Sequence, residues 1–206
     1  MRDGEREDAG GKARCFVAVD LEAAVRAEIA AVTEELRRAG GDIRWVGADN
    51  LHVTLKFLGT VGEPRRAAVR AALARIAAAT TPFELVVKGL GTFPSPQRAR
   101  VVWVGLVAEA MGALARRVED ELAGEGFPRE DRPFTPHVTI GRVRGARGWD
   151  RVLAAMAPYC EKEFGRSGVA DVVLYRSDLH PQGARYSALD RFALAGVERA
   201  SRPSGR

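Results

Sequence analysis

Histidine, cysteine and long apolar runs are all scarce in this 206-residue chain. Its two cysteines, Cys15 and Cys160, are too few for a disulfide scaffold, and their wide separation predicts two free thiols in a reducing compartment. No stretch approaches the roughly 18 uninterrupted apolar residues of a transmembrane helix. The opening MRDGEREDAGGK lacks the apolar core of a signal peptide. We therefore expect a soluble, cytoplasmic, monomeric protein with no membrane contact.

Basic residues outnumber acidic residues in this chain. The net charge is +5 and the isoelectric point is about 9.7. Arginine supplies most of the positive charge, and guanidinium groups bind phosphate in a bidentate manner. This composition favours a polyanionic partner such as nucleic acid. An arginine-rich genome would produce the same composition, so charge alone does not decide between the two explanations.

Hydrophobic periodicity predicts a chain in which strands often follow one another without an intervening helix. That order favours an α+β fold with antiparallel or mixed sheet. Both halves place a helix before and after a similar strand, so we expect residues 14–197 to form one domain of two pseudo-symmetric lobes. Residues 1–13 and 198–206 are expected to be disordered tails. The predicted strands are 14–21, 43–46, 51–59, 82–93, 100–106, 134–143, 164–179 and 184–194, and the predicted helices are 22–40, 63–80, 108–126 and 148–160.

Two of the three histidines occur in nearly the same local sequence. Residues 51–59 read LHVTLKFLG and residues 136–144 read PHVTIGRVR. Side chains alternate across a strand, so His52 shares a face with Thr54 and Lys56, and His137 shares a face with Thr139. The intervening apolar residues point the other way, toward a core. Neighbouring placement of the two strands would turn both imidazoles and both hydroxyls into one cleft.

This set of side chains suits attack on a phosphodiester. One imidazole can act as a base while the other acts as an acid, because imidazole titrates near neutral pH. The hydroxyls of Thr54 and Thr139 can donate to anionic oxygens, and Lys56 can add positive charge. Two histidines without a supporting Cys, Asp or Glu pattern make a poor zinc site. We therefore expect chemistry without a metal or another cofactor.

The repeated tetrads resemble the mark of the two-histidine (2H) phosphoesterases. Within that superfamily the chain is most similar to the RNA 2′,3′-cyclic phosphodiesterases, also called 2′-5′ RNA ligases. Further stretches carry the resemblance from about Arg14 to Leu194. They are RCFVAVDL, IRWVGADNLHVTLKFLG, GLGTFPSPQRARVVWVGL, RPFTPHVTIGRV and SDLHPQGARYSAL.

The resemblance implies a bilobal fold with outer helices and a central cleft between the lobes, and hydrolysis of an RNA 2′,3′-cyclic phosphate to a 2′-phosphate end. It implies that His137 is the base that activates water and that His52 is the acid that protonates the departing 3′-oxygen. Thr54 and Thr139 would hold the non-bridging phosphate oxygens. Reverse ligation to a 2′-5′ linkage without a nucleotide cofactor is also implied.

Several further residues need individual interpretation. Members of the family commonly read Leu-Ala-Arg where this chain has Ile140-Gly141-Arg142. Strict alternation places Arg142 on the apolar side, away from the cleft. It could bind phosphate only if a bulge near Gly141 turns it inward, or if it lies at the strand end and its side chain reaches around. Phe134 is the best candidate for stacking on a base, whereas Phe57, Trp45 and Trp103 are expected to pack in the core. His180 is expected at the surface of a turn, and Asp20 is expected to cap the helix that follows it.

Other functions fit parts of the same sequence. The same cleft could take small nucleotides, such as ADP-ribose cyclic phosphate or 2′-5′ oligonucleotides. A non-catalytic RNA-binding protein could keep the fold, although it would need no paired proton-transfer groups. A metal-dependent phosphatase is disfavoured because the chain has no carboxylate clusters.

Overall fold

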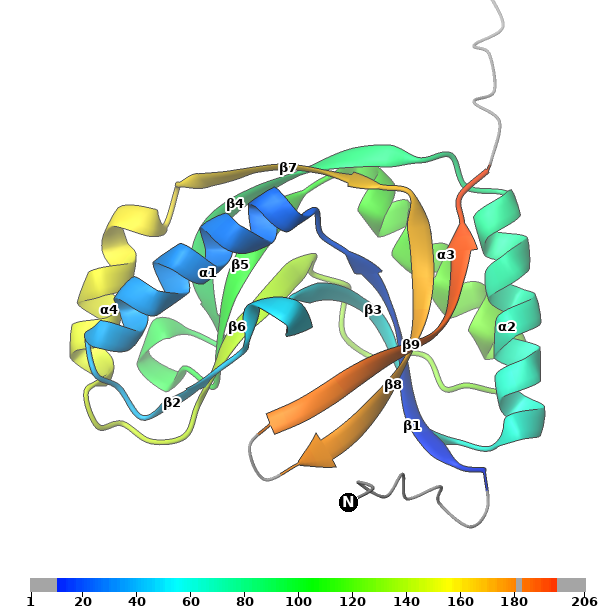
Figure 1. Cartoon of the computed structure of the whole chain (residues 1–206), viewed down its shortest axis with the longest axis horizontal. Helices are drawn as coiled ribbons and strands as arrows, with labels where there is room; N and C mark the ends of the chain where they lie inside the picture. Colours follow the sequence, from blue (N-terminus) through cyan, green and yellow to red (C-terminus); the bar gives the residue numbers. More distant parts are fainter. Residues whose placement is uncertain (1–10, 181–182, 196–206) are drawn as a thin grey trace, which may run out of the picture.

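The computed structural model describes residues 11–180 and 183–195 (Figure 1). The tails predicted at 1–13 and 198–206 lie outside these residues, apart from positions 11–13, and Ala13 already begins the first strand. The strands are β1 (Ala13–Asp20), β2 (Ile43–Trp45), β3 (His52–Val61), β4 (Phe83–Phe93), β5 (Val101–Val107), β6 (His137–Val143), β7 (Glu163–Val169), β8 (Asp171–His180) and β9 (Gly183–Ala193). The helices are α1 (Ala23–Arg38), α2 (Glu63–Ala78), α3 (Glu109–Gly124) and α4 (Trp149–Met156), with short 3₁₀ turns η1 (Ala48–Asn50), η2 (Pro96–Arg98) and η3 (Ala157–Tyr159).

The strands of the described chain form one curled antiparallel sheet with the order β7-β4-β5-β6-β3-β1-β8-β9, and β2 pairs with β6. Two four-stranded lobes, β7-β4-β5-β6 and β3-β1-β8-β9, meet where β6 pairs with β3. That junction is a single residue pair, Val53 with Val138. The α+β fold expected from the order of elements is confirmed, and every pairing is antiparallel.

The helices cover the outer face of the curled sheet (Figure 1). Helices α1 and α4 lie together over the lobe that contains β6, and α2 and α3 lie together over the lobe that contains β3. In α1 the apolar residues predicted to share one face, Val25, Ile29, Val32 and Leu36, are all buried. Burial of such a stripe stabilises a helix more than propensity does. The helices therefore leave the inner face of the sheet to the polar residues of the tetrads.

The segment 164–179, expected as one strand, is two strands that belong to different lobes. β7 pairs with β4 in one lobe, and β8 pairs with β1 in the other. The break falls at Ala170, which accepts a backbone hydrogen bond from Leu194. The chain thus crosses between lobes here, which a continuous run of strand-forming residues does not reveal.

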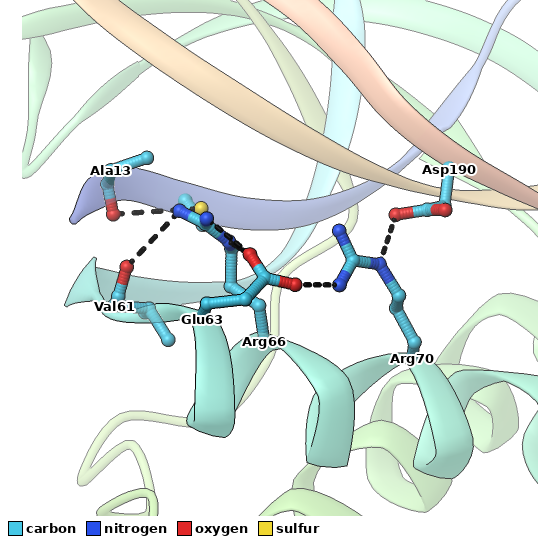
Figure 2. Close-up of polar contacts among 7 residues, drawn as sticks. Ala13, Val61, Glu63, Arg66, Arg70 and Asp190 are labelled. Carbon is cyan, nitrogen blue, oxygen red and sulfur yellow. Dashed lines mark hydrogen bonds and ion pairs between the residues drawn. The ribbon is translucent and has the colours of Figure 1, made fainter. Parts of the chain in front are cut away.

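Side-chain ion pairs hold α2 to the outside of the lobe that contains β3 (Figure 2). Glu63 binds Arg66, and its other carboxylate oxygen lies 2.6 Å from Arg70. Arg70 reaches onward to Asp190 on β9 at 2.7 Å, and Arg66 donates to the carbonyl of Val61 at the end of β3. The network therefore links α2 to both sides of its lobe, on the face opposite the tetrads.

Candidate active site

The junction of the two lobes brings the two tetrads together. β3 and β6 are antiparallel and pair at Val53 and Val138, the second residue of each tetrad. In that register His52 lies across from Thr139, and His137 lies across from Thr54. Cross-strand neighbours share one face of a sheet. Val53 and Val138 are fully buried on the outer side, while the four polar residues are half-buried on the inner side.

Each imidazole is held by the carbonyl two residues before it. The Nδ1 of His52 lies 2.8 Å from the Asn50 carbonyl oxygen, and the Nδ1 of His137 lies 2.7 Å from that of Thr135. A carbonyl only accepts, so each Nδ1 carries the proton that makes this hydrogen bond. In the neutral rings Nε2 is then the free basic atom. On His52 it lies 3.1 Å from the Thr54 hydroxyl.

Burial is the main cause of a lowered pKa at both histidines. For His52, the hydrogen bond to the Asn50 carbonyl and the charge of Asp20 oppose this effect, and the charges of His137 and Arg142 add to it. For His137, the hydrogen bond to the Thr135 carbonyl opposes burial, and Arg142 again lowers the pKa. The two rings and Arg142 therefore lie in one electrostatic neighbourhood.

Arg142 reaches this neighbourhood because of a bulge in β6. Residue Val102 of β5 pairs with Gly141, and Trp103 pairs with Thr139, so Ile140 is an extra residue that reverses the alternation. A Cβ atom at Gly141 would lie 2.9 Å from both Ile43 and Trp45 of β2. Glycine therefore leaves room for these two side chains of β2, the strand that pairs with β6 at the bulge. Of the two routes considered for Arg142, the bulge is the one present.

A bulge in β3 places Lys56 on the wrong side for the expected phosphate contact. Val17 of β1 pairs with Lys56 and Ala18 pairs with Thr54, so Leu55 is the extra residue. The Lys56 side chain is 1% exposed and lies on the outer face, where Nζ contacts both carboxylate oxygens of Glu119 at 2.8–2.9 Å. It also donates to the Pro128 carbonyl at 2.8 Å. The expectation that Lys56 shares the face of His52 is wrong.

The same bulge turns Phe57 to the inner face, and the two phenylalanines singled out in the sequence differ in exposure. Phe57, expected in the core, pairs with Phe16 on the inner face and is 60% exposed. Phe134, expected to stack on a base, is half-buried and packs against the hydrophobic core. Phe57 is therefore the aromatic side chain that the inner face offers to solvent. His180 is exposed at the end of β8, as expected.

Aromatic rings surround each imidazole, and the sequence interpretation missed most of them. The ring centre of His52 lies 4.8 Å from that of Phe16 and 5.1 Å from that of Tyr186. The ring of His137 meets Phe93 edge-on at 5.0 Å, and Phe93 in turn contacts Trp103. Phe16 could have been found from the alternation of β1, in which Cys15 and the two valines face the core.

Asp20 has a role at the site that differs from the helix cap expected of it. The residue at the N-terminus of α1 is Glu22, which makes no side-chain capping bond. Asp20 is instead the cross-strand partner of His52. It accepts a hydrogen bond from Tyr175 at 2.7 Å and pairs with Arg191 at 2.7 Å. Burial, followed by this hydrogen bond, raises the pKa of Tyr175 to about 12, so its phenol stays protonated.

A cavity of about 400 Å³ opens beside His52. It lies between β1, the start of α1, η1 and the β8–β9 pair. Its lining residues are Asp20, Leu21, Arg26, Asp49, Leu51, His52, Tyr175, Tyr186, Ala188 and Arg191. In the part of the chain that the structure describes, no three His, Cys, Asp or Glu side chains are grouped to hold a metal ion. No helix there is long and apolar enough to cross a membrane.

Residues 20–181 match the family model of the 2′-5′ RNA ligase superfamily. The chain belongs to this superfamily. The match covers both tetrads and the junction between the lobes, so the resemblance found in the tetrads is confirmed.

Curated relatives of this superfamily member match over nearly their whole length. An RNA 2′,3′-cyclic phosphodiesterase of Methanothermobacter thermautotrophicus is 35% identical over 89% of this chain and 100% of the relative. One from Archaeoglobus fulgidus is 37% identical over 87% of this chain and 99% of the relative.

Solved structures of the superfamily share the fold. The protein TT0787 of Thermus thermophilus aligns with a TM-score of 0.74 at 30% identity, covering 90% of this chain and 100% of that one. E. coli LigT complexed with 3′-AMP aligns with a TM-score of 0.73 at 29% identity, covering 89% and 98%.

Proposed function

We propose that this chain hydrolyses RNA 2′,3′-cyclic phosphate ends to 2′-phosphates by paired histidine catalysis that needs no metal. The observation that carries the proposal is the pair of imidazoles, one from each lobe, whose free Nε2 atoms belong to the same inner face at the junction of β3 and β6. The names of the two curated relatives support the same reaction.

The reaction follows from the protonation states that the site favours. The Nε2 of neutral His137 takes a proton from water as the water oxygen bonds to phosphorus. The bond from phosphorus to the ribose 3′-oxygen breaks, and the Nε2–H of protonated His52 gives its proton to that oxygen. The product carries a 2′-phosphate and a 3′-hydroxyl. Exchange with solvent then returns the two histidines to their starting states.

The surroundings of the two rings support His52 as the acid. Asp20 lies directly across the strand pair from His52, and its negative charge favours the protonated ring. For His137, no carboxylate of the described residues acts against burial and Arg142, the two causes that lower the pKa of both rings. Asp20 is therefore the feature that favours a proton on His52, and it has no counterpart at His137 among the described residues.

The remaining polar groups of the inner face serve the phosphate. The Thr54 hydroxyl lies 3.1 Å from the Nε2 of His52, next to the atom that transfers the proton. Thr54, Thr139 and Arg142 donate to the non-bridging oxygens, on which charge develops during the reaction. A 5′-hydroxyl in the place of water would form a 2′-5′ linkage by the same steps, so the site also supports reversible ligation.

The proposal is tested with a short RNA that ends in a 2′,3′-cyclic phosphate, incubated with the protein in excess EDTA. We expect conversion to a 2′-phosphate end, and loss of conversion in His52→Ala and His137→Ala. A 3′-phosphate product would mean that the other phosphorus–oxygen bond breaks. If the wild type shows no turnover, and both variants bind the RNA as tightly as the wild type does, the chain is a non-catalytic RNA-binding protein instead.

A further inference from the structure

The cavity beside His52 is asymmetric with respect to the two catalytic rings. His52 lines it, whereas His137, Thr54 and Thr139 do not. Its volume of about 400 Å³ lies within the range of sites that bind small molecules. The cavity is therefore an extension of the active site on the side of one histidine.

The proposed reaction determines which part of the substrate lies on that side. In a phosphoryl transfer the attacking and departing oxygens are roughly in line through phosphorus. The departing oxygen of a 2′,3′-cyclic phosphate is the 3′-oxygen of the terminal ribose, so the terminal nucleoside lies on the side of the acid. With His52 as the acid, that nucleoside lies beside the cavity, and water or a 5′-hydroxyl approaches from the side of His137.

The charges in the cavity suit a neutral, polar group. Asp20 and Arg191 are paired with each other, and Tyr175 donates to Asp20. Arg26 and Asp49 also line the cavity, and among the described residues neither side chain has a hydrogen-bond or ion-pair partner that would neutralise it. Apart from His52, which serves the departing oxygen, the cavity has two guanidinium groups and two carboxylates, which leave no net charge for a second phosphate. They leave one free donor and one free acceptor.

A nucleobase matches this lining. Its edge carries both N–H donors and carbonyl or ring-nitrogen acceptors, which Asp49 and Arg26 can complement. Its flat face suits the aromatic ring of Tyr186, which stands edge-on to His52 at the cavity wall. We propose that this cavity holds the base of the 3′-terminal nucleotide, with Arg26 and Asp49 reading its polar edge and Tyr186 contacting the ring. This inference rests on the proposed function.

The test fills the cavity without touching the catalytic groups. Ala188 on β9 lines the cavity and is exposed, so Ala188→Leu adds bulk there. Ala193→Leu makes the same change at an exposed position of the same strand outside the cavity and serves as the control. Steady-state kinetics are compared for guanosine 2′,3′-cyclic phosphate and for methyl ribofuranoside 2,3-cyclic phosphate, which has no base.

We expect the wild type to prefer the nucleotide by roughly ten- to hundredfold in kcat/KM, the range of one stacked base. Ala188→Leu should remove most of that preference by raising KM for the nucleotide, with the sugar phosphate unaffected. Arg26→Gln and Asp49→Asn should change the order of preference among the four nucleoside cyclic phosphates. Equal wild-type rates on both substrates, or equal losses on both in Ala188→Leu, would overturn the assignment. Hydrolysis of neither substrate by a wild type that hydrolyses the cyclic-phosphate RNA would also overturn the assignment, whereas inactivity on that RNA as well would mean that the proposed function itself has failed.

Discussion

The two lobes present the same local motif in different surroundings. In both, a histidine donates from Nδ1 to the carbonyl two residues upstream and is followed by a threonine on the same face. Around His52 stand Phe16, Tyr186 and the carboxylate of Asp20. Around His137 stand Phe93 and, behind it, Trp103, with no carboxylate of the described residues acting on its pKa.

The two histidines share the tautomer of the ring and differ in the charged and aromatic side chains around it. The repeated motif fixes the tautomer, so that Nε2 of each ring is free to move a proton. In the proposed mechanism, the carboxylate of Asp20 then favours His52 as the ring that holds the proton before reaction. A site built from two similar halves can thus perform an unsymmetrical reaction, because acid and base differ by the charges nearby and not by residue type.

Removal of either imidazole gives the largest expected effect. His52→Ala and His137→Ala should each lower the single-turnover rate on cyclic-phosphate RNA by about 10²–10⁴-fold, the usual contribution of a general acid or base. The loss should appear in the rate and not in folding, which circular dichroism of each variant would check. A loss below tenfold in either variant would show that the two rings do not share one reaction.

A better leaving group should separate the two variants. A p-nitrophenyl phosphodiester releases a stable phenolate that needs no proton, so the acid becomes dispensable while the base does not. We expect His52→Ala to regain most of the wild-type rate on this substrate and His137→Ala to stay impaired. Recovery of His137→Ala with continued impairment of His52→Ala would mean that His137 is the acid and His52 is the base.

Arg142 is the cation that both halves share. Arg142→Ala should reduce kcat/KM by about 10²–10³-fold, as expected for a group that donates to developing negative charge. It should also move both limbs of the pH profile to higher pH, because Arg142 lowers the pKa of both histidines. Arg144→Ala, at an exposed position just beyond β6, is the control. A pH profile that shifts in one limb only would place Arg142 beside a single ring.

Lys56 should affect folding and not catalysis. Lys56→Ala leaves Glu119 without its partner on the outer face, and we expect a loss of about 3 kcal/mol in the free energy of unfolding, measured with denaturant. The rate per folded molecule should be unchanged. Lys56→Met, which keeps the bulk, should be less destabilising. A raised KM for RNA at unchanged stability would instead mean that Lys56 contacts the substrate.

Strand periodicity predicted the tetrads well and failed only beyond the bulges. His52, Thr54, His137 and Thr139 lie before them and point as alternation requires. Lys56, Phe57 and Arg142 lie after them and are reversed. A bulge depends on the neighbouring strands, as the one in β6 does on the side chains of β2 that pack at Gly141, and that contact is not encoded in the local pattern.

Contacts between distant segments account for the rest of what was missed. The α+β class and the helices follow from local periodicity and were predicted. The split between β7 and β8 was not, because each strand is specified by its partner in a different lobe. The pairing of Asp20 with Tyr175 and Arg191 joins residues at opposite ends of the chain, and a cap before α1 was the nearest local explanation for that aspartate.

The smallest expected effect is a change in the pH profile, and it tests the difference between the lobes most directly. The rate should fall at low pH as His137 becomes protonated and at high pH as His52 loses its proton, giving a bell-shaped profile of kcat/KM. Both pKa values lie below the ordinary value of 6.5 in the free protein. The profile should therefore be centred on the acidic side of pH 6.5.

Asp20→Asn should move one limb of that profile and leave the other in place. The carboxylate of Asp20 raises the pKa of His52, so its removal lowers that pKa and brings the alkaline limb to lower pH. The amide still accepts the Tyr175 hydrogen bond, which preserves the packing. Asp171→Asn is the matched control, because Asp171 also pairs with Arg191 but does not act on His52. Movement of the acidic limb instead would mean that His52 is the base, since the carboxylate acts on that ring alone.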